Sequence, residues 1–543
     1  MTYSSPGQNN PDASTRPTPG ARCPFHPHPA ALSLGGICGF VGSILRDYLP
    51  GNDKPALDFG AVTHIPYSIE LMTQLVSLPA NPVELLKWVD TSFGPRAHFR
   101  FINNQDFFVF SDPTVVREIL KRTDRGRGDQ FDKSSFLSDG GGPLIGSDNM
   151  LVLSNNAWRE QHDLITPLFA RGEFNSPTRF NRVQSLVAAG IEDLRNRVRR
   201  GGDDGCQVDL LHETSLLGLR VTLQEILGVT LPEYEKLVAI RDASRIYHST
   251  FPAEAATPFN VPHELLSAVS SHSHEVEKAK QTLSQFIDEV IEEGRNIIST
   301  SPSVDTLCSR MIRASEGEGA IMSLEQVHYN LMAFLFAGHE STGSSLAYAW
   351  ARSALDETYR GAVRAERSSL QHSPATGVSD LLARSPFTNS LLDETLRWHP
   401  PVFSLFRVTT DHLNVMARGD AGEVRIPKGA EVILNLYNCH RDEETYGVST
   451  TGYPADQFEP RRWLPRELED GKPWQRPDIY SFGFGPRVCI GFHLYQTTAL
   501  SALQGLVDAF DVLPQFDHPD SNSGSDFTLQ RIGGLPAIVR VRN

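Results

Sequence analysis

The residue best suited to bind a metal is Cys489, near the end of the glycine-rich segment FGFGPRVCIG at residues 482–491. A cysteine among backbone N–H donors, just before a helical pattern, is expected to have a lowered pKa, because both features favour the thiolate. The thiolate is the form in which cysteine binds metals. The alternative is a buried structural cysteine in a turn, which is the commoner role of a single cysteine.

A second segment combines a carboxylic acid with two alcohols, in the sequence AGHEST at residues 337–342. Ser323 begins a capping box ahead of it, and the pattern that follows predicts a helix to about Trp350. A glycine inside a helix costs about 1 kcal/mol relative to alanine. Gly338 and Gly343 therefore indicate a close approach of the backbone, either to a flat cofactor or to a neighbouring helix.

Two further pairs have helical spacing. Glu394 and Arg397 are three residues apart and meet on one helix face, although many solvated helices carry such a pair. Trp158 and His162 are four residues apart on another helical pattern, where a lone histidine is usually an ordinary surface or core residue. Each pair alone is a weak signal.

Taken together, these segments resemble the cytochrome P-450 family. FGFGPRVCIG fills every fixed position of the family's heme-ligand signature FGxGxRxCxG, ETLR before WHPP matches its ExxR helix, and AGHEST matches its AGx(D/E)T segment. The resemblance runs from about residue 60 to the end, in the family's order. It implies a mainly α fold with a small β-sheet region, in which a single heme domain has a long central helix across the distal heme face.

The resemblance also implies that the chain binds heme b, with Cys489 as the thiolate ligand of the iron, and uses dioxygen. Arg487, Arg407 and the Trp158–His162 pair would hold the heme propionates, since a guanidinium pairs well with a carboxylate. The full set of implied heme-binding residues is Phe482, Gly483, Arg487, Cys489, Gly491, Trp158, His162, Arg407, Ala337 and Gly338.

For catalysis, the resemblance implies that Glu340 and a neighbouring alcohol deliver protons. Ser341 occupies the place of the family's usual threonine, and Thr342 follows it. Serine keeps the hydroxyl but lacks the β-methyl group that stiffens threonine. Glu394, Arg397 and Arg462 would form a structural triad beneath the cysteine loop, with Arg461 where the family more often has glutamate.

The implied substrate pocket is apolar, which favours a hydrophobic small molecule such as a lipid, a terpenoid or another secondary metabolite, hydroxylated or epoxidised. Its expected lining residues are Leu144, Ile145, Phe334, Phe336, Val402, Leu405 and Ile532. Two heme enzymes of other kinds remain as alternatives, namely a peroxide-using peroxygenase and an isomerase or dehydratase of an oxygenated lipid. A heme sensor or carrier is the non-enzyme alternative.

Composition supports a globular protein that does not bind nucleic acid. The 543 residues carry a net charge of −15, and 40% of them are hydrophobic. Six cysteines without a CxxC pair predict neither a disulfide framework nor a zinc site, and favour a reducing, cytoplasmic location. No flavin or ferredoxin module follows Cys489, so electrons from NAD(P)H are expected through a separate flavoprotein reductase or ferredoxin. We expect the chain to act as a monomer.

The elements that must position these residues are mostly helical. Apolar residues returning every three or four positions predict helices at 81–90, 112–122, 182–200, 274–298 and 323–350. Alternating patterns predict strands at 98–102 and 106–110, as a hairpin, and at 423–426 and 430–436. Surface loops are expected at 199–205 and 364–380.

The N-terminal 60 residues are expected to form a disordered tail ahead of the heme domain at 61–543. An apolar stretch at 31–45 is shorter than the roughly 20 residues that span a bilayer, so no convincing anchor is predicted. Peripheral contact of this stretch with an intracellular membrane remains open.

Overall fold

The computed structural model describes residues 58–66, 82–100, 105–123, 130–133, 145–146, 148–202, 204–248, 273–317, 319–466, 474–521, 523–525 and 528–542. The chain divides into residues 1–54 and 55–543, and every described residue belongs to the second unit. The predicted tail up to residue 57, with its apolar stretch 31–45, and the predicted pocket residue Leu144 lie outside the described residues.

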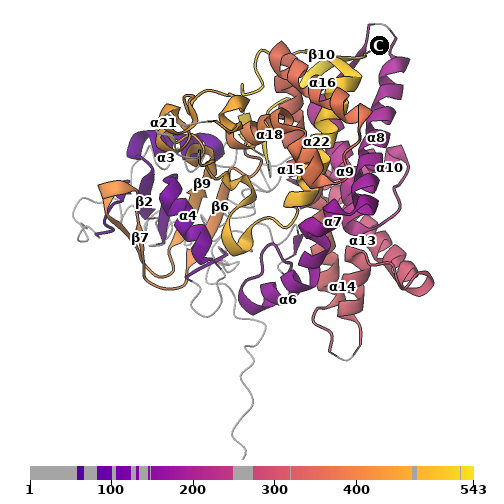
Figure 1. Ribbon diagram of the computed structural model, residues 1–543. Coiled ribbons are helices and arrows are strands. Elements are labelled where there is room, and N and C mark those ends of the chain that lie inside the picture. Colours follow the sequence, from indigo (N-terminus) through magenta and orange to yellow (C-terminus); the bar gives the residue numbers. More distant parts are fainter. Residues whose placement is uncertain are drawn as a thin grey trace, which may run out of the picture. The chain divides into compact units, whose positions relative to one another are not determined.

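Helices make up most of the described chain (Figure 1). The α-helices are α3 (Pro82–Phe93), α4 (Pro113–Arg122), α6 (Asn155–Ile165), α7 (Arg171–Asn175), α8 (Pro177–Arg200), α9 (Leu210–Val221), α10 (Tyr234–His248), α13 (Ser273–Thr300), α14 (Leu307–Ser315), α15 (Leu324–Leu355), α16 (Glu357–His372), α17 (Val378–Ala383), α18 (Pro386–Trp398), α19 (Leu436–Cys439), α20 (Glu443–Tyr446), α21 (Val448–Thr451) and α22 (Phe492–Ala509). The short 3-10 helices are η2 (Thr166–Phe169), η5 (Gly419–Ala421), η6 (Pro460–Trp463), η7 (Tyr480–Phe482) and η8 (Gly485–Arg487), and η3 (Thr222–Leu227) is a π-helix.

The strands β2, β6, β7 and β9 lie beside α3 and α4, whereas β10 lies among the helices, next to α16 (Figure 1). In the part of the chain that is described, the largest sheet has the order β1-β2-β3-β9-β6-β4, and the smaller ones are β10-β13-β5, β11-β12 and β7-β8. Their bounds are β1 (Thr63–His64), β2 (Arg96–Arg100), β3 (Asp106–Phe110), β4 (Phe131–Lys133), β5 (Cys206–Asp209), β6 (Ser404–Thr409), β7 (Leu413–Met416), β8 (Glu423–Ile426), β9 (Glu431–Asn435), β10 (Phe510–Pro514), β11 (Ser523–Ser525), β12 (Leu529–Arg531) and β13 (Pro536–Val541).

The central helix is α15, which is apolar around most of its circumference and is buried along most of its length. Ser323 and Gln326 form the predicted capping box at its start, with each side chain bonded to the other residue's backbone N–H. Helix α15 packs against α9, η3, α22 and α18. These contacts fix the position of the AGHEST segment among the neighbouring helices.

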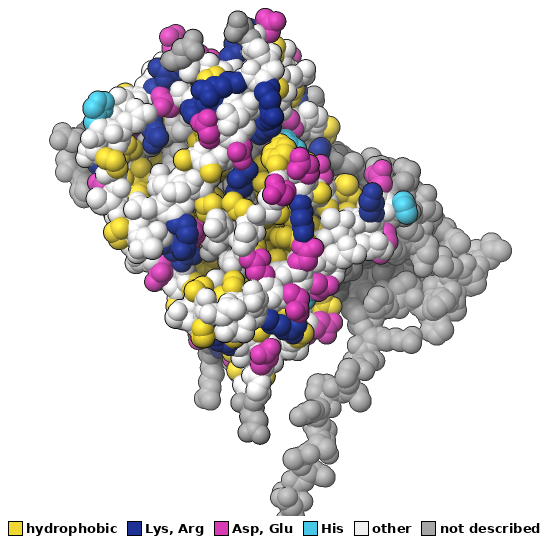
Figure 2. Space-filling model, turned by 90° about the vertical axis from the view of Figure 1, so that its right-hand side faces the viewer, with side chains coloured by type: hydrophobic (Ala, Val, Ile, Leu, Met, Phe, Trp, Pro, Cys, Tyr) yellow, Lys and Arg dark blue, Asp and Glu magenta, His cyan; other side chains and the backbone are white. Residues whose placement is uncertain are grey.

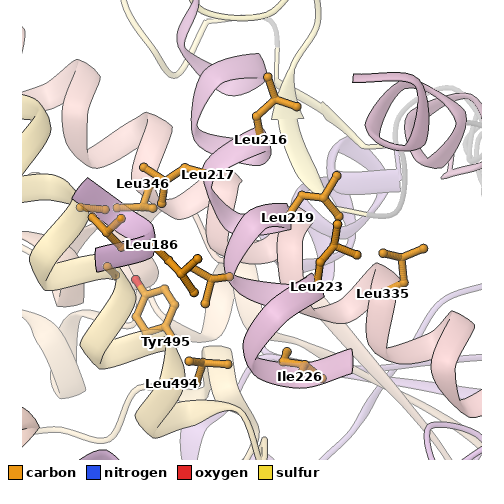
Figure 3. Packing of buried hydrophobic residues seen from close by; sticks show 14 of the residues in the cluster. Leu186, Leu216, Leu217, Leu219, Leu223, Ile226, Leu335, Leu346, Leu494 and Tyr495 are labelled. Atoms are coloured by element: carbon orange, nitrogen blue, oxygen red, sulfur yellow. The ribbon is translucent and has the colours of Figure 1, made fainter. Parts of the chain in front are cut away.

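The main hydrophobic core surrounds α15, where side chains from several helices meet (Figure 3). The labelled members include Leu186 of α8, Leu216, Leu217 and Leu219 of α9, Leu335 and Leu346 of α15, and Leu494 and Tyr495 of α22. A second core lies between α4 and the strands β3, β9, β7 and β8. The cysteine loop stands between these regions, since Phe482 packs against the first core and Phe484 against the second.

Most predicted elements are confirmed, with extended bounds. The five predicted helices correspond to α3, α4, α8, α13 and α15, and the strands β2 and β3 pair antiparallel as the predicted hairpin. The strands β8 and β9 exist but pair with β7 and β6, not with each other.

The loop predicted at 364–380 is wrong at both ends, because α16 continues to His372 and α17 begins at Val378. Val363 and Leu370 are buried seven residues apart on one face of α16, which packs against α22. The charged and serine-rich side chains on the other face conceal this spacing in the sequence. At 199–205, Arg199 and Arg200 still belong to α8, and the turn follows them.

The surface carries both signs of charge. On the face that Figure 2 shows, basic and acidic side chains are interspersed with hydrophobic ones, and no continuous basic stripe is visible. None of the helices in the described ranges is both long enough and apolar enough to cross a membrane.

Candidate functional site

The cysteine loop presents its sulfur at the wall of a cavity. Gly483 and Gly485 both have φ of +71°, and the N–H of Cys489 donates to the carbonyl of Phe482 at 2.8 Å, which closes the loop. A Cβ on Gly485 would lie 2.6 Å from the carbonyl oxygen of Leu120 in α4, so only glycine allows this approach. The side chain of Cys489 is exposed, and it lines the cavity.

The cavity has a volume of about 410 Å³ and mostly apolar walls. One wall is α15, through Phe334, Phe336, Ala337 and Ser341, and the cysteine loop lies on the lining as well. Asn330 ties α15 to the neighbouring α6, because its amide donates to Gln161 at 3.0 Å. The thiol, the central helix and α6 are thus brought to one enclosed space.

Cationic side chains also line this cavity. The guanidinium of Arg487 lies 4.0 Å from the centre of the Trp158 ring, and the rings of Trp158 and His162 are 4.5 Å apart. Arg407, on β6, is buried and donates to Thr123 Oγ1 at 3.2 Å. All four of these predicted residues line the same cavity as Cys489.

The predicted lowering of the Cys489 pKa is wrong. Although the Cys489 side chain is open to the cavity, the surrounding protein reduces its hydration and raises its pKa. The backbone N–H of Gly491 lowers the pKa by less. A coordinated metal cation deprotonates a thiol outright, so the loop itself need not stabilise the thiolate.

The donor set fits heme better than a bare metal ion. Protein sites for a bare zinc ion use three or more protein ligands. No group of three His, Cys, Asp or Glu side chains suited to a metal occurs within the described residues. Iron already held in a porphyrin needs only axial ligands, such as one thiolate. The apolar walls suit the ring, and the guanidinium groups of Arg407 and Arg487 suit its carboxylates.

The predicted structural triad is present and fully buried. Arg397 donates to both carboxylate oxygens of Glu394 at 2.8 Å, and Arg462 donates to Oε1 at 3.1 Å. Trp463 and the backbone N–H of Glu459 donate to the same carboxylate. The side chains of Glu394, Arg397 and Arg462 have no exposed surface. Their charges are therefore compensated inside the protein, as a buried ion pair requires.

The triad joins α18 to the chain that leads to the cysteine loop. Arg397 donates to the carbonyls of His440 and Ala455, each at 2.8 Å. His440 in turn accepts the N–H of Tyr480 at 2.9 Å, at the start of η7. The unusual Arg461 lies outside this network, half exposed, and pairs with Glu459 at 3.1 Å.

The predicted acid does not line the cavity. Glu340 is buried beside His248 of α10, whose Nδ1 faces Oε2, while its Oε1 accepts a hydrogen bond from Gln530 at 2.8 Å. Burial alone would raise the pKa of Glu340, but His248, His339 and the Thr528 hydroxyl hold it below its usual value. Of the three predicted catalytic residues, only Ser341 is on the cavity lining, and neither Glu340 nor Thr342 is.

The glycines of α15 allow close helix packing. A Cβ on Gly338 would lie 2.6 Å from Thr222 Oγ1, and one on Gly343 would lie 2.6 Å from the Cα of Ser215. Gly338 is not on the cavity lining. Packing against η3 and α9 accounts for both glycines, and the role of Gly338 in heme binding stays a prediction.

The predicted pocket residues divide into two groups. Ile145, Phe334, Phe336, Val402 and Leu405 line the cavity, together with the heme-binding candidates Ala337, Phe482 and Gly483. Ile532 does not line it, since its side chain is 62% exposed. Gly491 is not on the lining either, although a Cβ there would lie 3.7 Å from the Cys489 sulfur.

Sequence reasoning missed several residues around the cavity. Leu85, Leu86 and Val89 of α3 and Phe99 of β2 line it, as does Thr528 near the C-terminus. Their apolar spacing signals burial but does not distinguish a cavity wall from ordinary core. No local pattern marks His248, Thr528 or Gln530 as neighbours of Glu340.

Comparison with known proteins agrees with this geometry. The family model for cytochrome P-450 matches residues 64–535. Cyclooctatin synthase of Streptomyces melanosporofaciens is 27% identical over 442 residues, which cover 81% of this chain and 85% of that protein. Taxane 13-alpha-hydroxylase of Taxus cuspidata is 24% identical, covering 71% and 73% of the two chains. Leukotriene-B4 omega-hydroxylase 3 of Mus musculus is 24% identical, covering 92% and 88%.

The fold, the cysteine loop and these matches define a heme-thiolate protein. The chain belongs to the cytochrome P-450 family, and it is a heme-dependent monooxygenase.

Proposed function

We propose that this monooxygenase hydroxylates or epoxidises a hydrophobic small molecule, of the class of lipids, terpenoids or other secondary metabolites. The observation that carries the proposal is the cavity of about 410 Å³, with mostly apolar walls and Cys489 on its lining. An apolar cavity with few polar groups selects hydrophobic ligands and leaves their orientation to shape. The relatives are named for cyclooctatin, a taxane and leukotriene B4, and no one of these substrates follows for this chain.

In this proposal Cys489 would be the thiolate that binds the heme iron. Arg487, Arg407 and His162 would bind the propionates, and Trp158 holds the guanidinium of Arg487 in place. Heme supplies the activation of dioxygen that lets one oxygen atom enter the substrate.

The protein's own contribution is orientation and the exclusion of water. Phe334 stacks on Phe169 with ring centres 5.9 Å apart, so its face on the cavity is rigid. Val402 and Leu405 continue the apolar wall from the segment that follows α18. A hydrophobic substrate held between these walls displaces water from the part of the cavity that α15 lines.

Electrons come from NAD(P)H through a separate donor protein, a flavoprotein reductase or a ferredoxin. Two points support this proposal. The chain belongs to the cytochrome P-450 family, and inserting one atom of dioxygen into a substrate consumes two electrons.

Ligand titrations of the ferric protein test the substrate class. We expect apolar terpenes or fatty acids to shift the heme spectrum, and Phe334→Ala to weaken the best ligand about tenfold, which corresponds to about 1.4 kcal/mol. Ile532→Ala is the matched control, because Ile532 is exposed and off the cavity lining, and it should leave the affinity unchanged.

Two outcomes would contradict the proposal. The first is a spectral response to charged, polar metabolites only. The second is turnover with hydrogen peroxide that equals turnover with NADPH and a reductase, which would favour the peroxygenase alternative.

A further inference from the structure

Glu340 contacts three side chains that the sequence gives no reason to connect with it. On one side is His248, the last residue of α10. On the other side Oε1 accepts hydrogen bonds from Gln530 at 2.8 Å and from the hydroxyl of Thr528 at 3.3 Å. The carboxylate thus lies between an imidazole and a hydroxyl.

Thr528 is the member of this group that reaches the cavity. It lines the cavity, whereas Glu340, His248 and Gln530 do not. Its position is fixed by its neighbour Leu529, whose N–H donates to the Pro401 carbonyl at 2.9 Å. The carbonyl of Leu529 also accepts a hydrogen bond from Ser344 of α15, at 3.1 Å.

Ser341, the alcohol next to Glu340 in sequence, is engaged elsewhere. Its hydroxyl donates to the Ala337 carbonyl at 2.9 Å, one turn back on α15. Consecutive residues of a helix point about 100° apart, so the side chains of Glu340 and Ser341 leave the helix in different directions. No hydrogen bond between these two side chains occurs in the described structure.

His248 lies against the opposite oxygen of the carboxylate. It is buried, with its ring 4.6 Å from the Phe336 ring centre and 6.4 Å from that of His339. His339 donates from Nδ1 to the Leu335 carbonyl, and burial lowers its pKa to about 4, so it is neutral near pH 7. The positive charge of Arg241, on α10, also lowers the pKa of His339.

We propose that a proton passes from His248 through Glu340 to Thr528, and that Thr528 replaces Ser341 as the alcohol that delivers it to the cavity. The inference rests on the proposed function, because a monooxygenase consumes protons at this cavity.

The transfer leaves the charges of Glu340 and Thr528 unchanged, and the proton delivered to the cavity is the one that His248 loses. Glu340 Oε2 accepts the proton from His248 Nδ1, and the carboxyl group turns so that its O–H faces Thr528. The hydroxyl of Thr528 releases its own proton into the cavity as it accepts the one from Glu340. Glu340 and Thr528 then return to their starting forms, and His248 has lost one proton.

Coupling of substrate oxidation to NADPH consumption tests this role in the holoenzyme. Thr528→Val removes the hydroxyl at nearly constant shape, and we expect product per NADPH to fall about tenfold or more. Thr528→Ser should restore it to within about twofold, and Ser341→Ala should lower it clearly less than Thr528→Val does. A loss in Ser341→Ala with full coupling in Thr528→Val would overturn the proposal.

Infrared spectra of the resting protein provide a second test that needs no turnover. The carboxyl band that disappears in Glu340→Gln reports protonation of Glu340. It should appear at higher pH in Thr528→Val and in His248→Asn, because each removes a contact that favours the carboxylate. Ser341→Ala should leave the pH at which this band appears unchanged. If Glu340 titrates in Thr528→Val as it does in the wild type, the relay is refuted. This result is distinct from failure of the proposed function, which would show as a wild-type protein without turnover.

Discussion

The guanidinium of Arg487 lies 4.0 Å from the centre of the Trp158 ring, and this contact joins the cysteine loop to α6. Arg487 also donates to the carbonyls of Met150 and Leu153, at 3.4 and 2.5 Å, just before α6 begins. Two segments more than 300 residues apart in sequence are therefore positioned together at the cavity.

Trp158 is expected to determine how well heme is retained. Trp158→Leu removes the aromatic face beneath Arg487 and leaves the guanidinium held by the Met150 and Leu153 carbonyls, so we expect heme per protein to fall several-fold. Trp158→Phe keeps an aromatic face and should retain most of the heme. Heme content after purification measures both, and equal content in the two variants would contradict this role.

The buried triad should dominate stability beneath the cysteine loop. Arg462→Met leaves the buried Glu394 without one of its two guanidinium partners, so we expect a loss of about 3–5 kcal/mol in the free energy of unfolding. The control is Arg461→Met, an exposed neighbour whose loss should cost about 1 kcal/mol or less. Denaturant unfolding measures both, and similar losses in the two would refute the assignment.

The two glycines of the cysteine loop should differ in their tolerance of alanine. Both have φ of +71°, and Gly483, with ψ of −162°, lies in a backbone region almost exclusive to glycine, so this strain costs an alanine about 1–3 kcal/mol. At Gly483 a Cβ would meet nothing closer than 3.5 Å, whereas at Gly485 it would lie 2.6 Å from the Leu120 carbonyl oxygen. Gly485→Ala should thus lower the Tm clearly more than Gly483→Ala. The reverse order would show that α4 does not approach the loop this closely.

Buried neutral histidines should make the protein sensitive to acid. Burial lowers the pKa of His440 to about 3 and that of His339 to about 4, below the value of about 6.5 expected in the unfolded chain. The unfolded chain therefore binds more protons, and the stability these groups contribute is present above about pH 6.5 and is lost as the pH falls towards 4. The Tm of His440→Gln should decline less steeply over this range than that of the wild type. Parallel profiles would contradict the prediction.

The sequence could identify the parts of the site that follow from local spacing. Cys489 and its glycines lie within ten consecutive residues, and Glu394 and Arg397 are one helical turn apart. The neighbours of Glu340 could not be found this way, because Thr528 and Gln530 are 188 and 190 residues distant and carry no shared pattern. Tertiary packing alone brings them together.

Two predictions share one weakness, and neither Gly338 nor Ile532 is on the cavity lining. Gly338 suggested a cofactor and Ile532 suggested a pocket, since a small residue permits close approach and an apolar one prefers burial. Neither property says what the neighbour is. Thr222 fills the space beside Gly338, and Ile532 stands exposed in the turn before Gly533.

The carbon-monoxide difference spectrum of the reduced protein tests the central claim most directly. If Cys489 is the thiolate ligand of heme iron, the wild type gives the red-shifted Soret band typical of thiolate ligation, and Cys489→Ala, in which the sulfur is absent, does not. Absence of that band in the wild type, or its survival in Cys489→Ala, would contradict the account.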